Sequence, residues 1–191
     1  MNTQAQVFWF TGLSGAGKST VSELVRAELE GRGHRVLVLD GDDVRSGLHR
    51  NLGFTVADIL TNNALIADLC ATNRHLYDLI LVPIISPFKT FRRAAKERLG
   101  DGFHEIYCDA GLDIVSARDT KGLYARGRRG ELANVIGLST DVPYEAPDAP
   151  HLRLRTGEES AVESSKKLLA YVLSVVGRSD SHGTRKPPEQ S

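Results

Sequence analysis

The chain has 191 residues, of which 41% are hydrophobic, and its 24 Lys and Arg residues balance 24 Asp and Glu residues. This length suits one domain with a hydrophobic core. The zero net charge excludes a broad basic field, so we expect neither nucleic acid nor a membrane surface as a partner. Two distant cysteines, Cys70 and Cys108, lie in apolar segments. Together with the lack of a secretory signal or of a membrane-spanning apolar run, they favour a cytoplasmic protein with free thiols.

Strand-like and helical patterns alternate along the chain, which predicts a mostly parallel sheet covered on both faces. The predicted strands are residues 7–10, 35–39, 79–85, 104–108 and 152–154. The predicted helices are residues 21–32, 62–73, 89–99 and 158–176. The inward-facing residues are expected to be Leu24, Val25 and Leu29 in the first helix and Leu65, Ile66 and Leu69 in the second. The polar tail of residues 177–191 is predicted to be disordered, which leaves one domain of residues 1–176.

A phosphate-binding motif directly follows the first predicted strand. Residues 12–20 read Gly-Leu-Ser-Gly-Ala-Gly-Lys-Ser-Thr and fit G-x-x-x-x-G-K-[ST] at every fixed position. Glycines let successive backbone N–H groups surround a polyphosphate, and the next helix directs its positive end at the same anion. A plain Gly/Ser-rich connection is disfavoured because an amphipathic helix follows. The motif predicts a bound nucleoside triphosphate held by Gly12, Leu13, Ser14, Gly15, Ala16, Gly17, Lys18, Ser19 and Thr20, with Lys18 on the β- and γ-phosphates and Ser19 on Mg²⁺.

An acidic turn follows the second predicted strand and reads Asp40-Gly-Asp-Asp-Val-Arg45. Parallel sheets place ligands beyond the carboxyl ends of their strands, so this turn, the phosphate loop and residues 86–88 should share one crevice. Asp42 is a candidate for accepting a proton from an acceptor hydroxyl and for holding Mg²⁺, and Arg45 for clamping a second anion. The competing interpretation is a solvated acidic turn.

A basic segment spans residues 118–129, with five basic side chains, one acid, and glycines at 122 and 127 that would serve as hinges. Positive groups on a closing lid stabilise the charge of phosphoryl transfer and exclude water. A solvated helix face is the alternative. A regulatory GTPase is disfavoured because the D-x-x-G match at residues 119–122 comes late in the chain and no N-K-x-D sequence is present.

These motifs together resemble the adenylyl-sulfate kinase (APS kinase) family over residues 7–156. The resemblance rests on residues 12–20, Leu39-Asp-Gly-Asp-Asp-Val-Arg-Ser-Gly-Leu48, Leu52-Gly-Phe54, Ile85-Ser-Pro-Phe88, Arg118-Asp-Thr-Lys-Gly-Leu-Tyr124, Gly130-Glu-Leu132 and Pro143-Tyr-Glu-Ala-Pro147. It implies an α/β P-loop NTPase fold of three α/β/α layers, with a mostly parallel sheet and a mobile lid. It also implies transfer of the γ-phosphate of MgATP to the 3′-hydroxyl of adenylyl sulfate in sulfate assimilation, and a homodimer.

The resemblance also assigns roles to individual residues. It implies catalytic roles for Lys18, Asp42, Ser86 and Lys121, and metal binding by Ser19 and Asp42. On the ATP side it adds Arg118 and Arg126 to the phosphate loop. On the acceptor side it implies Asp42, Arg45, Phe54, Asn62, Ile85, Ser86, Lys121, Leu123 and Gly137, with Phe54 stacking on the acceptor base.

Two positions depart from the family pattern. Ile59 stands where the family has an arginine for the acceptor's phosphosulfate, and Val135 where it has a second base-stacking phenylalanine. If adenylyl sulfate is the acceptor, a replacement cation is expected from Lys89, Arg92 or Arg93. The departures keep a second hypothesis open, a kinase of a different nucleotide conjugate. A non-catalytic nucleotide-binding protein is a third.

Overall fold

The computed structural model describes residues 4–41, 44 and 52–180. Five strands form one sheet in the order β2-β3-β1-β4-β5, and every neighbouring pair is parallel. The strands are β1 (Gln6–Thr11), β2 (Val36–Val38), β3 (Leu79–Val82), β4 (Phe103–Cys108) and β5 (Leu152–Leu154). The structure confirms the predicted parallel sheet.

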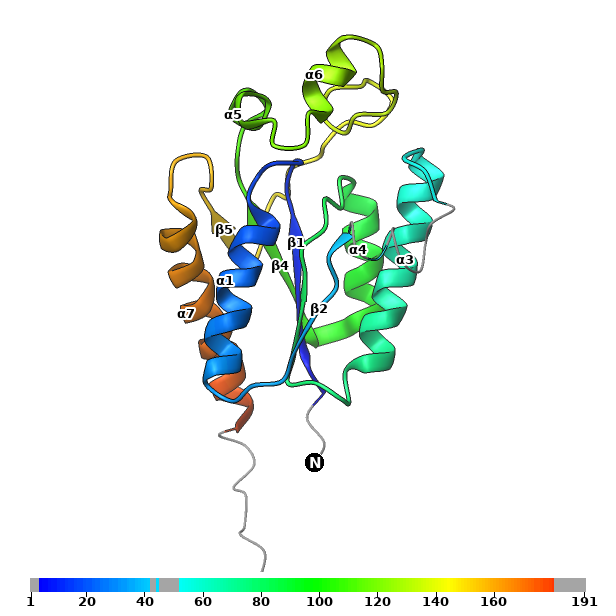
Figure 1. Cartoon of the computed structure of the whole chain (residues 1–191). Helices are drawn as coiled ribbons and strands as arrows, with labels where there is room; N and C mark the ends of the chain where they lie inside the picture. The colour runs from blue at the N-terminus through cyan, green and yellow to red at the C-terminus, as the bar shows by residue number, and fades with distance from the viewer. Residues whose placement is uncertain (1–3, 42–43, 45–51, 181–191) are drawn as a thin grey trace, which may run out of the picture.

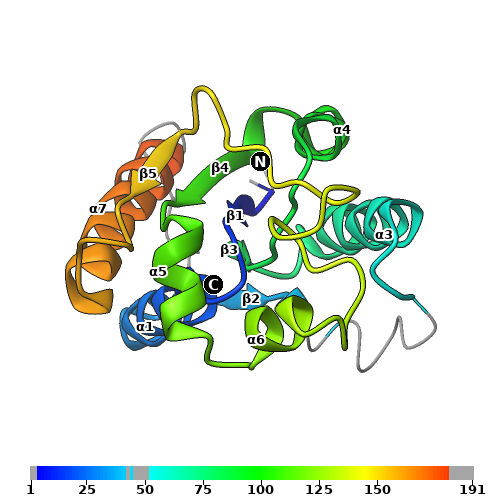
Figure 2. The ribbon, with the colours of Figure 1, turned by 90° about the horizontal axis from the view of Figure 1, so that it is seen from above.

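Helices cover both faces of the sheet and give three layers (Figure 1). The first face carries α1 (Lys18–Gly31) and α7 (Ala161–Asp180), and the second carries α3 (Val56–Asn73) and α4 (Lys89–Leu99). A short 3₁₀ turn, η1 (Gly100–Gly102), links α4 to β4. Two short helices, α5 (Leu112–Arg118) and α6 (Leu123–Arg128), lie above the carboxyl ends of the strands (Figure 2).

The central strand β1 joins two hydrophobic cores. Phe8 and Phe10 pack into the cluster of α1 and α7, whereas Val7 and Trp9 pack into the cluster of α3 and α4. All four side chains are fully buried. Successive side chains of a strand point to opposite faces, so a continuous apolar run is what a strand buried on both faces requires.

Some predicted boundaries were wrong. The third strand ends at Val82 rather than residue 85, because Pro83 lacks the N–H that a sheet ladder needs. Helix α3 begins at Val56 rather than residue 62. Its start is fixed by a capping box, in which the Thr55 hydroxyl accepts from the Asp58 N–H and the Asp58 carboxylate accepts from the Thr55 N–H, both at 3.2 Å.

Two residues expected to face inward lie on the surface. Leu24 is 42% exposed and Leu65 is 39% exposed, whereas Val25, Leu29 and Ile66 are fully buried. Each exposed leucine directly precedes a buried residue, and one residue turns a helix by about 100°. The predicted apolar stripes were therefore one residue too wide.

The last helix runs beyond the predicted end of the domain. Helix α7 continues to Asp180, past the predicted boundary at residue 176, and the predicted disorder of the tail beyond it lies outside the described residues. Cys70 and Cys108 are buried and free, as predicted. Across the described ranges no helix is long and apolar enough to span a membrane.

Gly12 lets the chain turn sharply out of β1. Its φ is +147°, and a Cβ atom there would lie 2.5 Å from the carbonyl oxygen of Cys108 on the neighbouring strand β4. Only a residue without a side chain fits such a close approach of two backbones. The phosphate loop therefore starts directly against the sheet.

We expect Gly12→Ala to lower the free energy of unfolding by more than about 2 kcal/mol, because the new methyl group meets backbone that cannot move aside. Urea unfolding measures the loss. Gly31→Ala at the end of α1, where the new Cβ meets no atom within 4 Å beyond its chain neighbours and its own helix backbone, is the control. It should leave the stability unchanged or raise it by up to about 1 kcal/mol. Equal small effects in both variants would contradict the close approach.

Candidate active site

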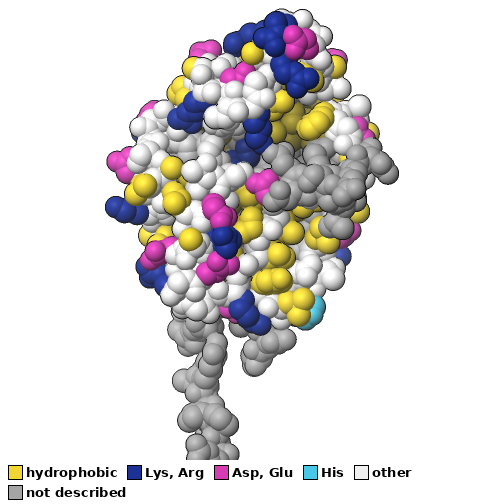
Figure 3. Space-filling view, viewed as in Figure 1, with side chains coloured by type: hydrophobic (Ala, Val, Ile, Leu, Met, Phe, Trp, Pro, Cys, Tyr) yellow, Lys and Arg dark blue, Asp and Glu magenta, His cyan; other side chains and the backbone are white. Residues whose placement is uncertain are grey.

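Segments that are distant in sequence enclose one cavity of about 350 Å³ above the carboxyl ends of β1, β2 and β3. The phosphate loop, Asp40 and Gly41 after β2, and residues 83–87 after β3 all line it, which confirms that they share one crevice. Helix α3 and the segment before it contribute Phe54, Ile59, Asn62 and Asn63, and Thr120, Lys121 and Leu123 come from the predicted lid. Lys and Arg side chains gather at the top of the molecule, over α6 (Figure 3). The cavity thus opens between the sheet and a basic cover.

The phosphate loop has the geometry that its motif predicts. Gly15 and Gly17 have positive φ angles of 76° and 86°, and Gly17 is the N-cap of α1. Lys18 is buried, and its ammonium group donates to the carbonyl oxygens of Gly12 at 2.9 Å and Leu13 at 2.7 Å. The first turn of α1 carries no acidic residue of its own, and the positive end of the helix favours a bound anion. This corner of the cavity is built for an anion.

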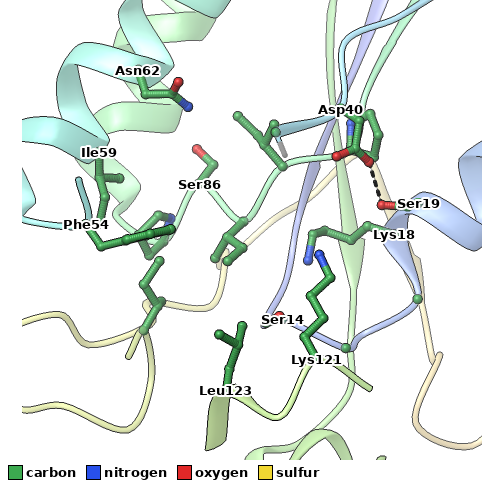
Figure 4. Close-up of a pocket in the computed structure, with 18 of the residues that line it drawn as sticks. Ser14, Lys18, Ser19, Asp40, Phe54, Ile59, Asn62, Ser86, Lys121 and Leu123 are labelled. Carbon is green, nitrogen blue, oxygen red and sulfur yellow. Dashed lines mark hydrogen bonds between the residues drawn. The ribbon is translucent and has the colours of Figure 1, made fainter. Parts of the chain in front are cut away.

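Ser19 and Asp40 form a pair of oxygen donors beside the loop. The Ser19 hydroxyl donates to Asp40 Oδ2 at 2.6 Å (dashed line in Figure 4). A hydroxyl and a carboxylate are ligands that Mg²⁺ prefers, so these residues fit the predicted metal. The other predicted ligand, Asp42, lies outside the described residues, as does Arg45. Sequence reasoning treated the acidic turn as a unit and missed Asp40, although Asp40 directly follows the apolar run of its strand.

Two lid side chains hold the outer carbonyls of the phosphate loop. The Tyr124 hydroxyl donates to the Ser14 carbonyl at 2.9 Å, and burial raises the pKa of Tyr124 to about 12, so the donor stays protonated. Arg118 donates to the Thr156 carbonyl at 2.7 Å and to Gly15 at 3.4 Å. These contacts place the lid segment directly over the loop.

The two predicted nucleotide-binding arginines do not line this cavity. Arg118 is used on the loop and Thr156, and the exposed Arg126 lies 3.6 Å from Glu131. Gly12, Leu13 and Ala16 are buried in or behind the loop rather than facing the cavity. Lys121 and Leu123 do face it, and Figure 4 shows Lys121 extending from the lid toward Lys18.

Two glycines near the lid serve close packing. A Cβ atom at Gly127, a predicted hinge, would lie 2.8 Å from Val135 Cγ2, so the backbone here packs closely against its neighbour. Gly137, predicted to contact the acceptor, has a φ of +82°, and a Cβ there would lie 2.5 Å from Leu13 Cδ2. Gly137 supports the phosphate loop from behind and does not line the cavity.

The far side of the cavity is largely apolar. Phe54, which is 52% exposed, and Ile59, which is 3% exposed, face it together with Ile136. Asn62, Ile85 and Ser86 complete this side, and Figure 4 shows Asn62 and Ser86 turned toward each other. Val135, where the resemblance has a stacking phenylalanine, packs into the α1–α7 core and does not line the cavity, whereas its neighbour Ile136 does.

The three cations expected to replace the missing arginine have other partners. Arg92 is buried and pairs with Glu105 at 2.6 Å, Lys89 pairs with Asp148 at 2.7 Å, and Arg93 lies 3.9 Å from Glu97. None of the three lines the cavity, so this expectation was wrong. Among the cavity-lining residues that the structure describes, the basic ones are Lys18 and Lys121.

A phosphate loop at the carboxyl ends of a parallel sheet, under a basic cover, defines the P-loop kinase class of nucleotide-binding folds. Residues 4–155 match the family model described as adenylylsulphate kinase. The chain belongs to the adenylylsulphate kinase family, which confirms the resemblance drawn from its motifs.

Three relatives illustrate the range of this family. The adenylyl-sulfate kinase of Paraburkholderia xenovorans is 42% identical, with 88% of this chain and 93% of that protein covered. The bifunctional enzyme NodQ of Azospirillum brasilense is 47% identical over 81% of this chain, which spans only 25% of NodQ. The structure of the Mycobacterium tuberculosis APS kinase CysC in complex with AMPPNP and APS superposes with a TM-score of 0.84 at 37% identity, covering 90% of this chain and 98% of that one.

We expect Asp40→Asn to raise the Mg²⁺ concentration that supports half-maximal ATP binding by at least about tenfold, because an amide lacks the charge that attracts the cation. Calorimetric titration of ATP at a series of Mg²⁺ concentrations measures the shift. Asp101→Asn, an exposed carboxylate in η1, is the control and should leave the dependence unchanged. Identical curves for the two variants would contradict a role for Asp40 at the metal.

Proposed function

We propose that this protein is a kinase that transfers the γ-phosphate of ATP to the 3′-hydroxyl of adenylyl sulfate, as in sulfate assimilation. One observation carries the proposal. A single cavity sets Lys18 and the Ser19–Asp40 pair on one side and Phe54, Asn62 and Ser86 on the other. This arrangement suits a triphosphate facing a nucleotide acceptor, and family membership supports the same pair of substrates.

On the donor side, the backbone N–H groups of the phosphate loop surround the ATP phosphates. Lys18 releases the carbonyls of Gly12 and Leu13 and moves to the β- and γ-phosphates, and Lys121 approaches them from the lid. Two positive groups that face the transferred phosphoryl stabilise the charge that spreads over it in the transition state. Ser19 and Asp40 would hold Mg²⁺, which supplies further neutralisation of that charge.

On the acceptor side, Phe54 offers an exposed ring for stacking on the acceptor base. Asn62, Ser86 and Ile85 hold the acceptor opposite the γ-phosphate. We propose that Asp42 accepts the proton of the attacking hydroxyl and that Arg45 holds the acceptor's anionic group. Both residues lie outside the described part of the chain, so these two roles rest on the motif alone.

A second acceptor class is favoured by one specific observation. Ile59, where the family resemblance places an arginine, presents aliphatic surface on the acceptor side of the cavity together with Ile136, and Val135, where the resemblance places a stacking aromatic, packs into the core instead. An acceptor with less distal charge than adenylyl sulfate suits such a wall. The second candidate is therefore phosphorylation of a different nucleotide conjugate.

The assembly and setting of the protein are further proposals. The chain spans about a quarter of the length of the NodQ relatives, so a larger bifunctional assembly and its partners are not implied. A homodimer, a lid that closes over the substrates and a cytoplasmic location stay predictions. Light scattering of the purified chain tests the dimer.

We expect Lys18→Ala to lower kcat for phosphoryl transfer by at least about 10³-fold, because its charge acts mainly in the transition state. Release of ADP with adenylyl sulfate as acceptor measures this in a coupled assay. Lys166→Ala on the exposed face of α7 is the control. Near-normal turnover in a folded Lys18→Ala protein would rule out the phosphate-loop mechanism.

If adenylyl sulfate is the acceptor, binding does not depend on a cation at position 59, so we expect the wild-type chain to use it efficiently and Ile59→Arg to change its kcat/KM by less than about threefold. A feeble wild type that Ile59→Arg combined with Ile136→Phe improves strongly would favour the second acceptor class instead. Ile136→Phe is the informative partner because Ile136 lines the cavity. Val135→Phe is the control, because it introduces the same ring one residue away, in the core rather than in the cavity.

A further inference from the structure

A buried hydroxyl joins three segments beneath the cavity. Thr11, the last residue of β1, is fully buried. Its hydroxyl oxygen lies 2.9 Å from the Ile85 carbonyl, 3.1 Å from the Ser86 carbonyl and 2.9 Å from the Tyr144 hydroxyl. Ile85 and Ser86 belong to the segment after β3, and Tyr144 belongs to the segment that precedes β5.

The direction of these hydrogen bonds follows from counting protons. A hydroxyl has one proton to donate, and a carbonyl oxygen can only accept. The Thr11 proton therefore goes to the carbonyls of Ile85 and Ser86, and the Tyr144 hydroxyl must donate to Thr11. Burial raises the pKa of Tyr144 well above its ordinary value, which keeps that phenol protonated.

Ser86 adopts a conformation that needs such support. Its φ is +42°, which is unfavourable for a residue with a side chain. Besides Thr11, the buried Arg92 donates to the Ser86 carbonyl at 2.7 Å. Arg92 is anchored in turn by the Glu105 carboxylate at 2.6 Å and the Glu145 carbonyl at 2.7 Å. Strained backbone persists only when its surroundings over-determine it, and here two donors meet at one carbonyl.

The same junction reaches the donor side of the cavity. Gly12 directly follows Thr11, and its N–H donates to the Ile85 carbonyl at 3.3 Å. Two neighbouring residues, Thr11 and Gly12, thus tie the start of the phosphate loop to the segment of Ile85 and Ser86, which forms the floor of the cavity on the acceptor side. The Ser86 hydroxyl is buried, lines the cavity and has no hydrogen-bond partner among the described residues, so it is held there for contact with whatever occupies the cavity.

We propose that Thr11 is a positioning residue that sets the distance between the phosphate loop and the acceptor floor at Ser86, with Tyr144 orienting its hydroxyl. This inference rests on the proposed transfer between two bound substrates. A misplacement of about 1 Å between reacting groups costs on the order of 10²-fold in rate. Small changes at this junction should therefore be visible in turnover before they are visible in ATP binding.

Isosteric variants test the proposal. Thr11→Val removes the hydroxyl and keeps the shape, whereas Thr11→Ser keeps the hydroxyl. We expect Thr11→Val to lower kcat by at least about tenfold with the KM for ATP changed less than about threefold, and Thr11→Ser to retain kcat within about threefold. Tyr144→Phe should lower kcat by an intermediate factor, and adding it to Thr11→Val should have no further effect because the shared partner is already gone.

The matched control is Tyr107→Phe. Its hydroxyl donates to Asp109 at 2.9 Å and its ring stacks on Tyr144, so its hydrogen bond lies outside the Thr11 network. This variant should keep wild-type kcat. Equal kcat in Thr11→Val and Thr11→Ser, or an equal loss in Tyr144→Phe and Tyr107→Phe, would overturn the proposal. If Thr11→Val does not fold, the Tyr144→Phe and Tyr107→Phe pair decides alone.

A second measurement separates this inference from the proposed function. Hydrogen exchange of the peptide over residues 84–92 should be faster in Thr11→Val than in Thr11→Ser, whatever the acceptor is. A wild type that fails to phosphorylate adenylyl sulfate would defeat the proposed function and leave this comparison standing. Unchanged exchange in Thr11→Val would defeat the junction even in an active enzyme.

Discussion

The close contact between the backbone of residue 12 and the carbonyl of Cys108 is the constraint on which the site depends. It brings the start of the phosphate loop down onto the neighbouring strand, where a side chain would not fit. The loop then has the sheet as its base, Gly137 packed behind it and the lid contacts of Tyr124 and Arg118 above it. An anion site formed from backbone N–H groups needs this rigidity because its donors must already point inward.

The two sides of the cavity differ in how they are held. The donor side is fixed by main-chain geometry and by one lysine. The Ser86 segment on the acceptor side is instead held by buried side chains from other elements, Thr11 and Arg92. Among them is the Arg92–Glu105 pair, in which both groups are largely shielded from water. Breaking one member of such a pair leaves a buried charge uncompensated, so this network is costly to alter. Changes of acceptor are easier at the aliphatic wall formed by Ile59 and Ile136.

Sequence reasoning captured what depends on short-range pattern. The phosphate-loop motif, the parallel sheet and the meeting of three strand ends followed from spacing and from strand order. The structural role of Arg92 could not be predicted, because its partner Glu105 lies on another element. The sequence shows which residues are charged but not which of them form ion pairs within the fold. Ile136 was missed because neighbouring residues of an irregular segment face opposite ways. Leu24 and Leu65 are exposed although they fit the helical spacing of the apolar residues, so spacing alone does not define the edge of the buried face.

The chain contains a single tryptophan, and its position determines what light emission from this protein reports. Trp9 is fully buried in the α3–α4 core, on the strand that runs up to the loop, with Phe103 6.0 Å away. Its indole N–H meets no polar partner in the described part of the chain, so the emission of the folded protein should be shifted to the blue. Because the ring is buried in this core and does not line the cavity, tryptophan fluorescence should follow unfolding of the core and be a poor reporter of nucleotide binding.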